Sequence, residues 1–339
     1  MKKICITGVS GFLGSHMALY GLQKGYQIVG TVRSEEKAAE TRSMLSQYLD
    51  ESSLEKLEFR YADLLVKDGW DEAVRDCDAV MHVASPFILE IPKHEDELIL
   101  PARNGVKHVF EAALKNNVNR IIQTSSIVAI VYGNDKNKTD FNEADWTNPE
   151  SKMASPYSKS KTLAERDVWN YAKSHPQLNV TTINPGFVLG PILGKDPGTS
   201  ATVILRMIKG EYPGVPKLGF PTIDVRDVVE LHYLALENPK SVGQRYAAVS
   251  SSVWFKDLAR FVLESDAQNT KKVKTFEMPN WFVTLYAIFE KSAKMILPEL
   301  GFMANISNEK AKTELGFKPR SVKEAVAATV ESCIINKLV

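Results

Sequence analysis

A tyrosine and a lysine four residues apart, Tyr157 and Lys161, are the residues best suited to proton transfer. A spacing of four places both side chains on one face of a helix. A phenol with a pKa of about 10 is a poor proton shuttle at neutral pH, but a nearby ammonium favours the phenolate. Lowering that pKa by about three units requires about 4 kcal/mol of differential stabilisation. The pair therefore predicts a phenol that exchanges a proton with a substrate.

Hydroxyl groups follow an apolar run in the segment Arg120-Ile121-Ile122-Gln123-Thr124-Ser125-Ser126. The run predicts a buried strand, and a hydroxyl at its end is placed to hydrogen-bond a carbonyl oxygen that gains negative charge. A Tyr-x-x-x-Lys pattern alone also fits a surface tyrosine beside a helical lysine. Its combination with the two serines and with a glycine-rich turn favours the chemical interpretation.

This glycine-rich turn, Gly8-Val9-Ser10-Gly11-Phe12-Leu13-Gly14, directly follows the apolar run Ile4-Cys5-Ile6-Thr7. Glycines allow a tight turn, the approach of backbone N–H groups to a pyrophosphate and close packing of helix on strand. The helix N-terminus also attracts phosphate. The spacing differs from G-x-G-x-x-G, and a lone glycine pattern fits many turns. Its position between a first strand and a helix nevertheless predicts that residues 8–14 bind a dinucleotide.

Cations stand at the end of the second apolar run, where NAD-binding folds often place an acid on the ribose 2′-hydroxyl. The Arg33 guanidinium matches the geometry of a 2′-phosphate, and Lys37 adds a point charge. NADP(H) is therefore favoured over NAD(H), with a solvated Arg-Lys pair at a helix start as the alternative. Asp63, at the end of the third run, is placed either to accept from the adenine amino group or to cap a helix.

An alternation of strands and helices is needed to bring these groups to one edge of a sheet. Short β-branched runs occur at residues 4–7, 26–32, 57–61, 79–84, 120–125 and 180–184. Amphipathic segments separate them at residues 11–24, 35–49, 68–75, 96–115 and 157–174. This order predicts an α/β fold with a Rossmann-type, doubly wound parallel sheet that binds ligands at its carboxyl edge.

After Pro185 the alternation gives way to Gly/Pro-rich loops and further helices. We expect a smaller, mostly helical C-terminal lobe that closes over the carboxyl edge of the sheet and binds the substrate. The expected NADP-binding domain comprises residues 1–185 and about 219–250. The expected substrate-binding lobe comprises about 186–218 and 251–339.

Composition and charge limit the remaining function classes. The 339 residues, 44% hydrophobic and 24% charged, suit a folded chain of about two domains. The net charge of +1 supplies no general attraction to nucleic acid or to anionic lipid. Three scattered cysteines suit a reducing compartment, and no stretch matches a signal peptide or a membrane span. We expect a cytoplasmic protein with no nucleic-acid or membrane partner.

Taken together, these motifs resemble those of an extended short-chain dehydrogenase/reductase. Within that superfamily the sequence is similar to the dihydroflavonol reductases, the cinnamoyl-CoA reductases and the NADPH-dependent aldehyde and ketone reductases. The Ser-Pro-Phe and Asn-Glu-x-x-Trp elements are specific to this branch. The likeness rests on the residues given above and on Val83-Ala84-Ser85-Pro86-Phe87, Phe141-Asn142-Glu143 with Trp146, residues 184–191 and residues 224–228.

The resemblance implies a role for each site residue. It implies that Ser126 orients a substrate carbonyl, with Ser125 as the alternative hydroxyl, and that Tyr157 donates the proton. It implies that Lys161 lowers the pKa of Tyr157 and holds the nicotinamide ribose. Phe87 would form part of the substrate wall, or else ordinary core. The further cofactor contacts that it implies are Arg33, Lys37, Asp63, Leu64, Ala84, Pro185, Val188 and Ser200, the last of which is otherwise a loop hydroxyl.

The predicted function is hydride transfer from NADPH to an aldehyde or ketone, with Tyr157 as proton donor. The apolar segment Ile127-Val128-Ala129-Ile130 favours a small or apolar carbonyl compound over a polyhydroxylated flavonoid. We expect no metal site, structural roles for His82 and His232, and a monomer or homodimer. Alternatives on the same fold are a hydroxysteroid dehydrogenase and a nucleotide-sugar epimerase or dehydratase. A different class of alternative is a non-catalytic, NADP-sensing binding protein.

Overall fold

Seven short strands form the central sheet of this computed structural model, which describes residues 2–85, 92, 94–134, 137–266, 268–288, 294 and 296–339. Their order is β10-β7-β5-β4-β1-β2-β3, and every pair is parallel. The strands are β1 (Lys3–Ile6), β2 (Gln27–Val32), β3 (Leu57–Tyr61), β4 (Ala79–His82), β5 (Arg120–Thr124), β7 (Asn179–Pro185) and β10 (Gln244–Ala248). Because both faces are covered, β1, β2 and β4 are buried almost throughout and occur as continuous apolar runs. The predicted parallel, doubly wound sheet is confirmed.

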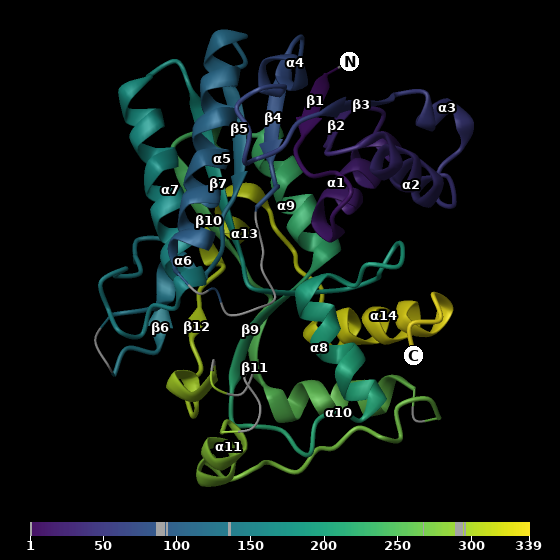
Figure 1. Cartoon of the computed structure of the whole chain (residues 1–339), viewed down its shortest axis with the longest axis vertical. Coiled ribbons are helices and arrows are strands. Elements are labelled where there is room, and N and C mark those ends of the chain that lie inside the picture. Colours follow the sequence, from purple (N-terminus) through teal and green to yellow (C-terminus); the bar gives the residue numbers. More distant parts are fainter. Residues whose placement is uncertain are drawn as a thin grey trace.

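Helices cover both faces of the sheet (Figure 1). Met17, Leu45 and Val228 contribute to the core on one face, and Trp70, Phe110 and Val168 contribute to the core on the other. The helices of the first face are α1 (Phe12–Gln23), α2 (Glu35–Leu45), α9 (Val225–Glu237) and α13 (Glu309–Leu315). Those of the second face are α4 (Trp70–Val74), α5 (Asp96–Lys115) and α7 (Pro156–Ser174). Two short helices, α3 (Glu51–Leu54) and α6 (Val128–Val131), lie in connections.

A second group of elements lies at one end of the sheet, in the lower half of Figure 1. It contains a three-stranded sheet in the order β11-β9-β8, which the sequence pattern did not predict. The strands are β8 (Phe187–Leu189), β9 (Gly219–Asp224) and β11 (Ser251–Trp254), with a separate pair of β6 (Asp140–Phe141) and β12 (Asn305–Ile306). The helices are α8 (Gly198–Lys209), α10 (Phe255–Ser265), α11 (Asn280–Tyr286) and α14 (Val322–Ile335). The domain boundaries expected from the sequence stay a prediction.

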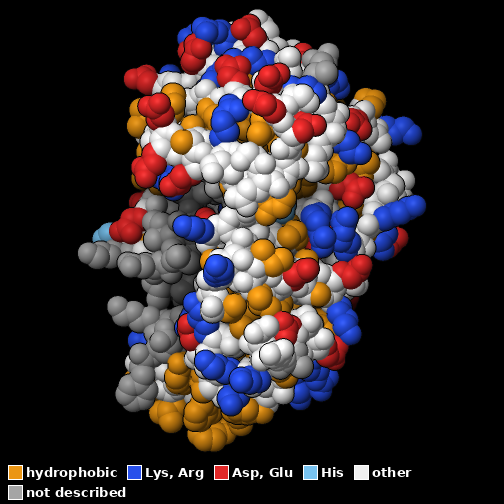
Figure 2. All heavy atoms as spheres, turned by 90° about the vertical axis from the view of Figure 1, so that its right-hand side faces the viewer, with side chains coloured by type: hydrophobic (Ala, Val, Ile, Leu, Met, Phe, Trp, Pro, Cys, Tyr) orange, Lys and Arg blue, Asp and Glu red, His pale blue; other side chains and the backbone are white. Residues whose placement is uncertain are grey.

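The surface of the molecule carries charges of both signs. Figure 2 shows Lys and Arg interspersed with Asp and Glu over one face, so this face presents no single-signed field. Hydrophobic side chains gather at the lower tip, where α11 lies in Figure 1. The exposed hydrophobic side chains within α11 and next to it in the chain include Phe276, Trp281, Leu285 and Ile288. Within the described residues, no helix is both long enough and apolar enough to cross a bilayer.

Candidate active site

Helix α7 begins where its sequence specifies a start, and this places the tyrosine and lysine. Ser155 is the N-cap and accepts a hydrogen bond from the backbone N–H of Ser158 at 3.1 Å, and Pro156 occupies the first helical position. Tyr157 therefore lies in the first turn, with Lys161 one turn further on. The Nζ atom of Lys161 lies 5.9 Å from the centroid of the Tyr157 ring, so the two side chains share one face.

The two serines that follow β5 have different partners. Ser125 Oγ donates to the buried carboxylate of Glu165 at 2.5 Å. The Ser126 side chain hydrogen-bonds with Tyr157, and its Oγ accepts from the backbone N–H of Val128 at 3.3 Å. The geometry therefore brings Ser126, and not Ser125, into contact with Tyr157.

Burial dominates the electrostatics of this group in the protein alone. It raises the pKa of Tyr157 above its ordinary value, and the hydrogen bond with Ser126 opposes that rise. Burial also lowers the pKa of Lys161 to about 8, while the Glu165 carboxylate opposes that fall. Tyr157 thus keeps its proton at neutral pH, which is the form that a proton donor requires.

The glycine-rich turn has the geometry of a phosphate-binding turn. Gly8 follows β1 with a φ of +67°, and a Cβ there would lie 2.9 Å from the Cβ of Ala84. At Gly14 a Cβ would lie only 2.3 Å from the Gly8 carbonyl oxygen, so helix α1 packs directly on the turn. Gly11 is the N-cap of α1 and has no side chain to bond the first-turn N–H groups. These groups fit an anion such as a pyrophosphate.

The predicted phosphate cations lie at the end of β2 and the start of α2. Arg33 and Lys37 are both exposed there. Lys37 forms an ion pair with Glu40, with Nζ and Oε2 2.7 Å apart. Asp63 uses Oδ1 to accept from the backbone N–H of Leu65 at 2.9 Å, so its side chain closes a turn and caps no helix.

The remaining predicted cofactor residues come from separate loops. Ala84 donates its backbone N–H to Thr7 Oγ1 at 2.9 Å, which holds it beside the glycine turn. Pro185 ends β7, Val188 lies in β8, and Ser200 lies in the first turn of α8. The start of α8 is close to the turn, because a Cβ on Gly198 would lie 3.1 Å from the Cβ of Phe12. Leu64 lies against Gly105 of α5. Phe87 lies outside the described residues.

Sequence reasoning missed two polar pairs near this group. Glu165 and Arg245 form a buried ion pair, with Oε1 and Nε 2.7 Å apart. Tyr132 and Glu299 hydrogen-bond each other, and burial raises the pKa of both. The pKa of Tyr132 is also raised by the proximity of Tyr157, so this pair lies near the predicted site residues. The four-residue spacing places Glu165 on the same face of α7 as Lys161 but does not show that it is buried, and Glu299 lies far away in sequence.

His82 and His232 have the structural roles expected of them. His82 Nδ1 lies 2.8 Å from Thr7 Oγ1, and His232 Nε2 lies 2.8 Å from Thr124 Oγ1. Burial lowers the pKa of His82 to about 3 and that of His232 to about 4, so both are neutral at pH 7. In the part of the chain that the structure describes, no cluster of His, Cys, Asp and Glu could hold a metal ion.

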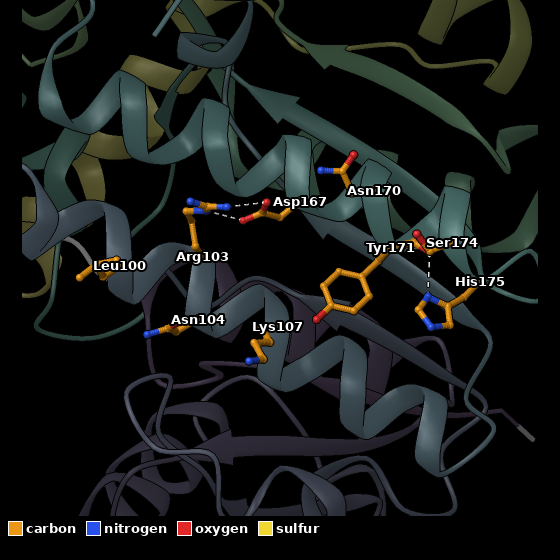
Figure 3. A pocket seen from close by; sticks show the side chains of 9 residues that line it. All are labelled: Leu100, Arg103, Asn104, Lys107, Asp167, Asn170, Tyr171, Ser174 and His175. Carbon is orange, nitrogen blue, oxygen red and sulfur yellow. Dashed lines mark hydrogen bonds and ion pairs between the residues drawn. The ribbon is translucent and has the colours of Figure 1, made fainter. Parts of the chain in front are cut away.

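Two cavities differ in their relation to these residues. A small cavity of about 20 Å³ lies beside Lys161 and is also lined by His82, Gln123, Ser125 and Glu165. A hollow of about 350 Å³ lies between α5 and α7 (Figure 3). There Arg103 and Asp167 point toward each other in an ion pair of 2.6 Å. None of the predicted site residues lines this hollow, so the candidate active site is at the sheet edge.

Comparisons with known proteins agree with one another. Residues 4–248 match the NAD dependent epimerase/dehydratase family. A cinnamoyl-CoA reductase of Medicago truncatula is 31% identical over 97% of this chain and 94% of its own. The NADPH-dependent methylglyoxal reductase of Saccharomyces cerevisiae is 27% identical over 98% of both chains. The crystal structure of yeast methylglyoxal/isovaleraldehyde reductase with NADPH has a TM-score of 0.82 and 26% identity, and the match covers 99% of this chain and 100% of that chain.

Proposed function

Because this chain belongs to the NAD dependent epimerase/dehydratase family, we propose that it is an NADPH-dependent oxidoreductase that reduces an aldehyde or ketone carbonyl. The resemblance predicted from the motifs is thereby confirmed at the level of the family. The relatives that match nearly the whole chain are named as reductases, and one of them as NADPH-dependent. The observation that carries the proposal is the Ser126–Tyr157 hydrogen bond with Lys161 beside it.

The chain's own residues divide the reaction between them. When bound, NADPH supplies hydride to the carbonyl carbon. Ser126 donates a hydrogen bond to the carbonyl oxygen as negative charge develops there. Tyr157 gives its phenolic proton to that oxygen, which completes the alcohol. The Lys161 ammonium then stabilises the phenolate that remains.

The geometry of the cofactor-binding residues supports NADP(H). The uncapped start of α1 suits the pyrophosphate, and the close contact between Gly8 and Ala84 leaves no room for a side chain in this turn. Arg33 is exposed at the end of β2, where the 2′-phosphate would lie. Val188 and Ser200 complete the proposed cofactor contacts from the second group of elements.

The substrate class, the oligomeric state and the location of the protein are part of the same proposal. We propose a small or apolar carbonyl substrate, a monomeric or homodimeric protein and a cytoplasmic location. Cys5, Cys77 and Cys333 are buried and free, which supports a reducing compartment.

The test is the loss of NADPH absorbance with a panel of aldehydes, ketones, diketones and a dihydroflavonol. We expect turnover of at least one small carbonyl compound and little turnover of the dihydroflavonol. Tight NADPH binding without any turnover would contradict the proposal and favour a cofactor sensor. Conversion of a nucleotide sugar without net NADPH consumption would favour an epimerase or dehydratase.

A further inference from the structure

Glu165 is a buried carboxylate that the proposed reaction does not use. Its Oε2 accepts from Ser125 Oγ at 2.5 Å and from Asn184 Nδ2 at 2.7 Å. Asn184 Nδ2 also donates to the backbone carbonyl of Ser126 at 3.1 Å. One carboxylate oxygen therefore joins α7 to the end of β5 and, through β7, to the residue that contacts Tyr157.

The second oxygen of Glu165 belongs to another set of contacts. Its Oε1 accepts from Arg245 Nε of β10 at 2.7 Å and from Thr182 Oγ1 of β7 at 3.2 Å. Trp169 Nε1 of α7 lies 3.4 Å from the same oxygen. The donors to this carboxylate are thus neutral groups and Arg245. Together they stabilise the negative charge of Glu165, which would be unfavourable in a buried position without such partners.

Arg245 is in turn fixed by the Asn-Glu-x-x-Trp segment. Its Nη1 donates to the carbonyl oxygens of Glu143 and Asp145 at 2.6 and 2.8 Å. Its guanidinium carbon lies 3.8 Å from the centroid of the Trp146 ring. Glu143 Oε1 accepts from the backbone N–H of Ala247 at 3.0 Å. The segment therefore serves as a clamp on Arg245, and so on Glu165, at the back of the catalytic residues.

Glu165 also faces Lys161. The two residues are one turn apart on α7 and line the same small cavity. Among the residues that the structure describes, the titratable and charged groups around Lys161 are Tyr157 and Glu165 of its own helix and His82 of β4, and Arg245 of β10 lies beyond Glu165. Because His82 is neutral at pH 7, Glu165 is the anion of this set.

We propose that Glu165 is a positioning residue for the reaction: its carboxylate fixes the strand end that carries Ser126 and acts as the counter-charge of the Lys161 ammonium. This inference rests on the proposed function and deepens it. It assigns the Asn-Glu-x-x-Trp segment a supporting role for Glu165 through Arg245.

The test compares Glu165→Gln with the wild type in NADPH binding, kcat and the pH profile of kcat/KM. An amide presents a donor where Ser125 and Asn184 both donate, so we expect a fall in kcat of about 10²-fold. Loss of the negative charge should move the alkaline limb down by about one pH unit or more. NADPH affinity should stay within about threefold, because Glu165 lies behind the catalytic residues. A wild-type kcat and pH profile would overturn the inference.

Two variants separate the two effects. Glu165→Asp keeps the charge and shortens the reach, so kcat should fall while the alkaline limb stays near its wild-type position. Ser125→Ala removes one donor to Glu165, so kcat should fall. It leaves the charge of Glu165 in place, so the alkaline limb should not move. If Glu165→Gln fails to fold, these two variants carry the test, and a wild-type kcat in both would overturn it.

Asp167→Asn is the matched control. It makes the same carboxylate-to-amide change on the same helix and also breaks an ion pair, with Arg103 of α5, but in the hollow between α5 and α7, which none of the predicted site residues lines (Figure 3). We expect wild-type kcat and an unchanged pH profile.

Absence of turnover in the wild-type protein would refute the proposed function itself. Normal turnover in the wild-type protein, with no effect of Glu165→Gln on kcat or on the pH profile, would refute only the role of Glu165.

Discussion

At the scale of single residues, burial raises the pKa of the Tyr157 phenol and lowers the pKa of the Lys161 ammonium to about 8. The four-residue spacing correctly placed Tyr157 and Lys161 on one face, and hydrogen bonding distinguishes Ser126 from Ser125. The direction of the Tyr157 pKa shift could not be read from the sequence, because it depends on burial by segments distant in the chain. Glu165 was missed because a lone glutamate in a helix is indistinguishable from a solvated one until its partners are known.

The pH dependence of the reaction follows from Lys161. Its pKa is lowered to about 8, so the ammonium is present below that pH and lost above it. We expect kcat/KM, which reports the free enzyme, to fall as the pH rises through about 8. In Lys161→Arg the guanidinium stays charged, so any residual activity should lack this limb. An unchanged limb in that variant would assign it to another group.

At the scale of elements, buried strands with continuous apolar runs were predictable, and those with other patterns were not. The first six strands of the large sheet lie within or beside the predicted runs. The edge strand β10 was missed because Gln244-Arg245-Tyr246-Ala247-Ala248 has a buried arginine and little β-branching. That arginine is the partner of Glu165, so local pattern and tertiary role conflict at the same residue. β9 was missed because Pro221 is unfavourable in most strands.

The turn between β1 and α1 allows a test with a matched control. Gly8 and Gly25 both have positive φ, but a Cβ at Gly8 meets Ala84 whereas a Cβ at Gly25 meets open space. Gly25→Ala should lower the free energy of unfolding by about 1 to 2 kcal/mol, the backbone penalty alone, and leave NADPH affinity unchanged. Gly8→Ala should destabilise the protein further and weaken NADPH binding about tenfold or more. Chemical denaturation and NADPH titration measure both effects, and equal NADPH affinity in the two variants would contradict the phosphate-binding role of the turn.

At the scale of the whole molecule, the fold class was predictable from the order of elements, but the composition of the second group of elements was not. Its three-stranded sheet pairs β8 with β9 and β9 with β11, segments that are far apart in the chain. Such pairings depend on tertiary contacts and leave only weak local patterns. The same long-range packing brings Glu299 to Tyr132, a contact that the sequence did not indicate because the two residues lie far apart in the chain.

Cofactor preference should appear as stability of the whole molecule. NADPH at about 100 times its Kd should raise the free energy of unfolding by about 2.7 kcal/mol, and the melting temperature by about 4 °C for a chain of this size. NADH at the same concentration should raise the free energy of unfolding and the melting temperature less. Arg33→Asp should reverse that order, while Arg260→Asp on α10 makes the same charge change far from β2 and should preserve it. A preference for NADPH that survives in Arg33→Asp would place the phosphate contact elsewhere.

The convergence of Ser126, Tyr157 and Lys161 on one carbonyl is tested most directly by the turnover number of Tyr157→Phe, measured alongside its NADPH affinity. Tyr171→Phe removes a hydroxyl from the same helix in the hollow between α5 and α7, away from the predicted site residues, and is the control. We predict that Tyr157→Phe lowers kcat by about 10³-fold and leaves the NADPH affinity unchanged. Tyr171→Phe should leave both kcat and the NADPH affinity unchanged. A Tyr157→Phe protein that reduces the carbonyl at the wild-type rate would contradict the account.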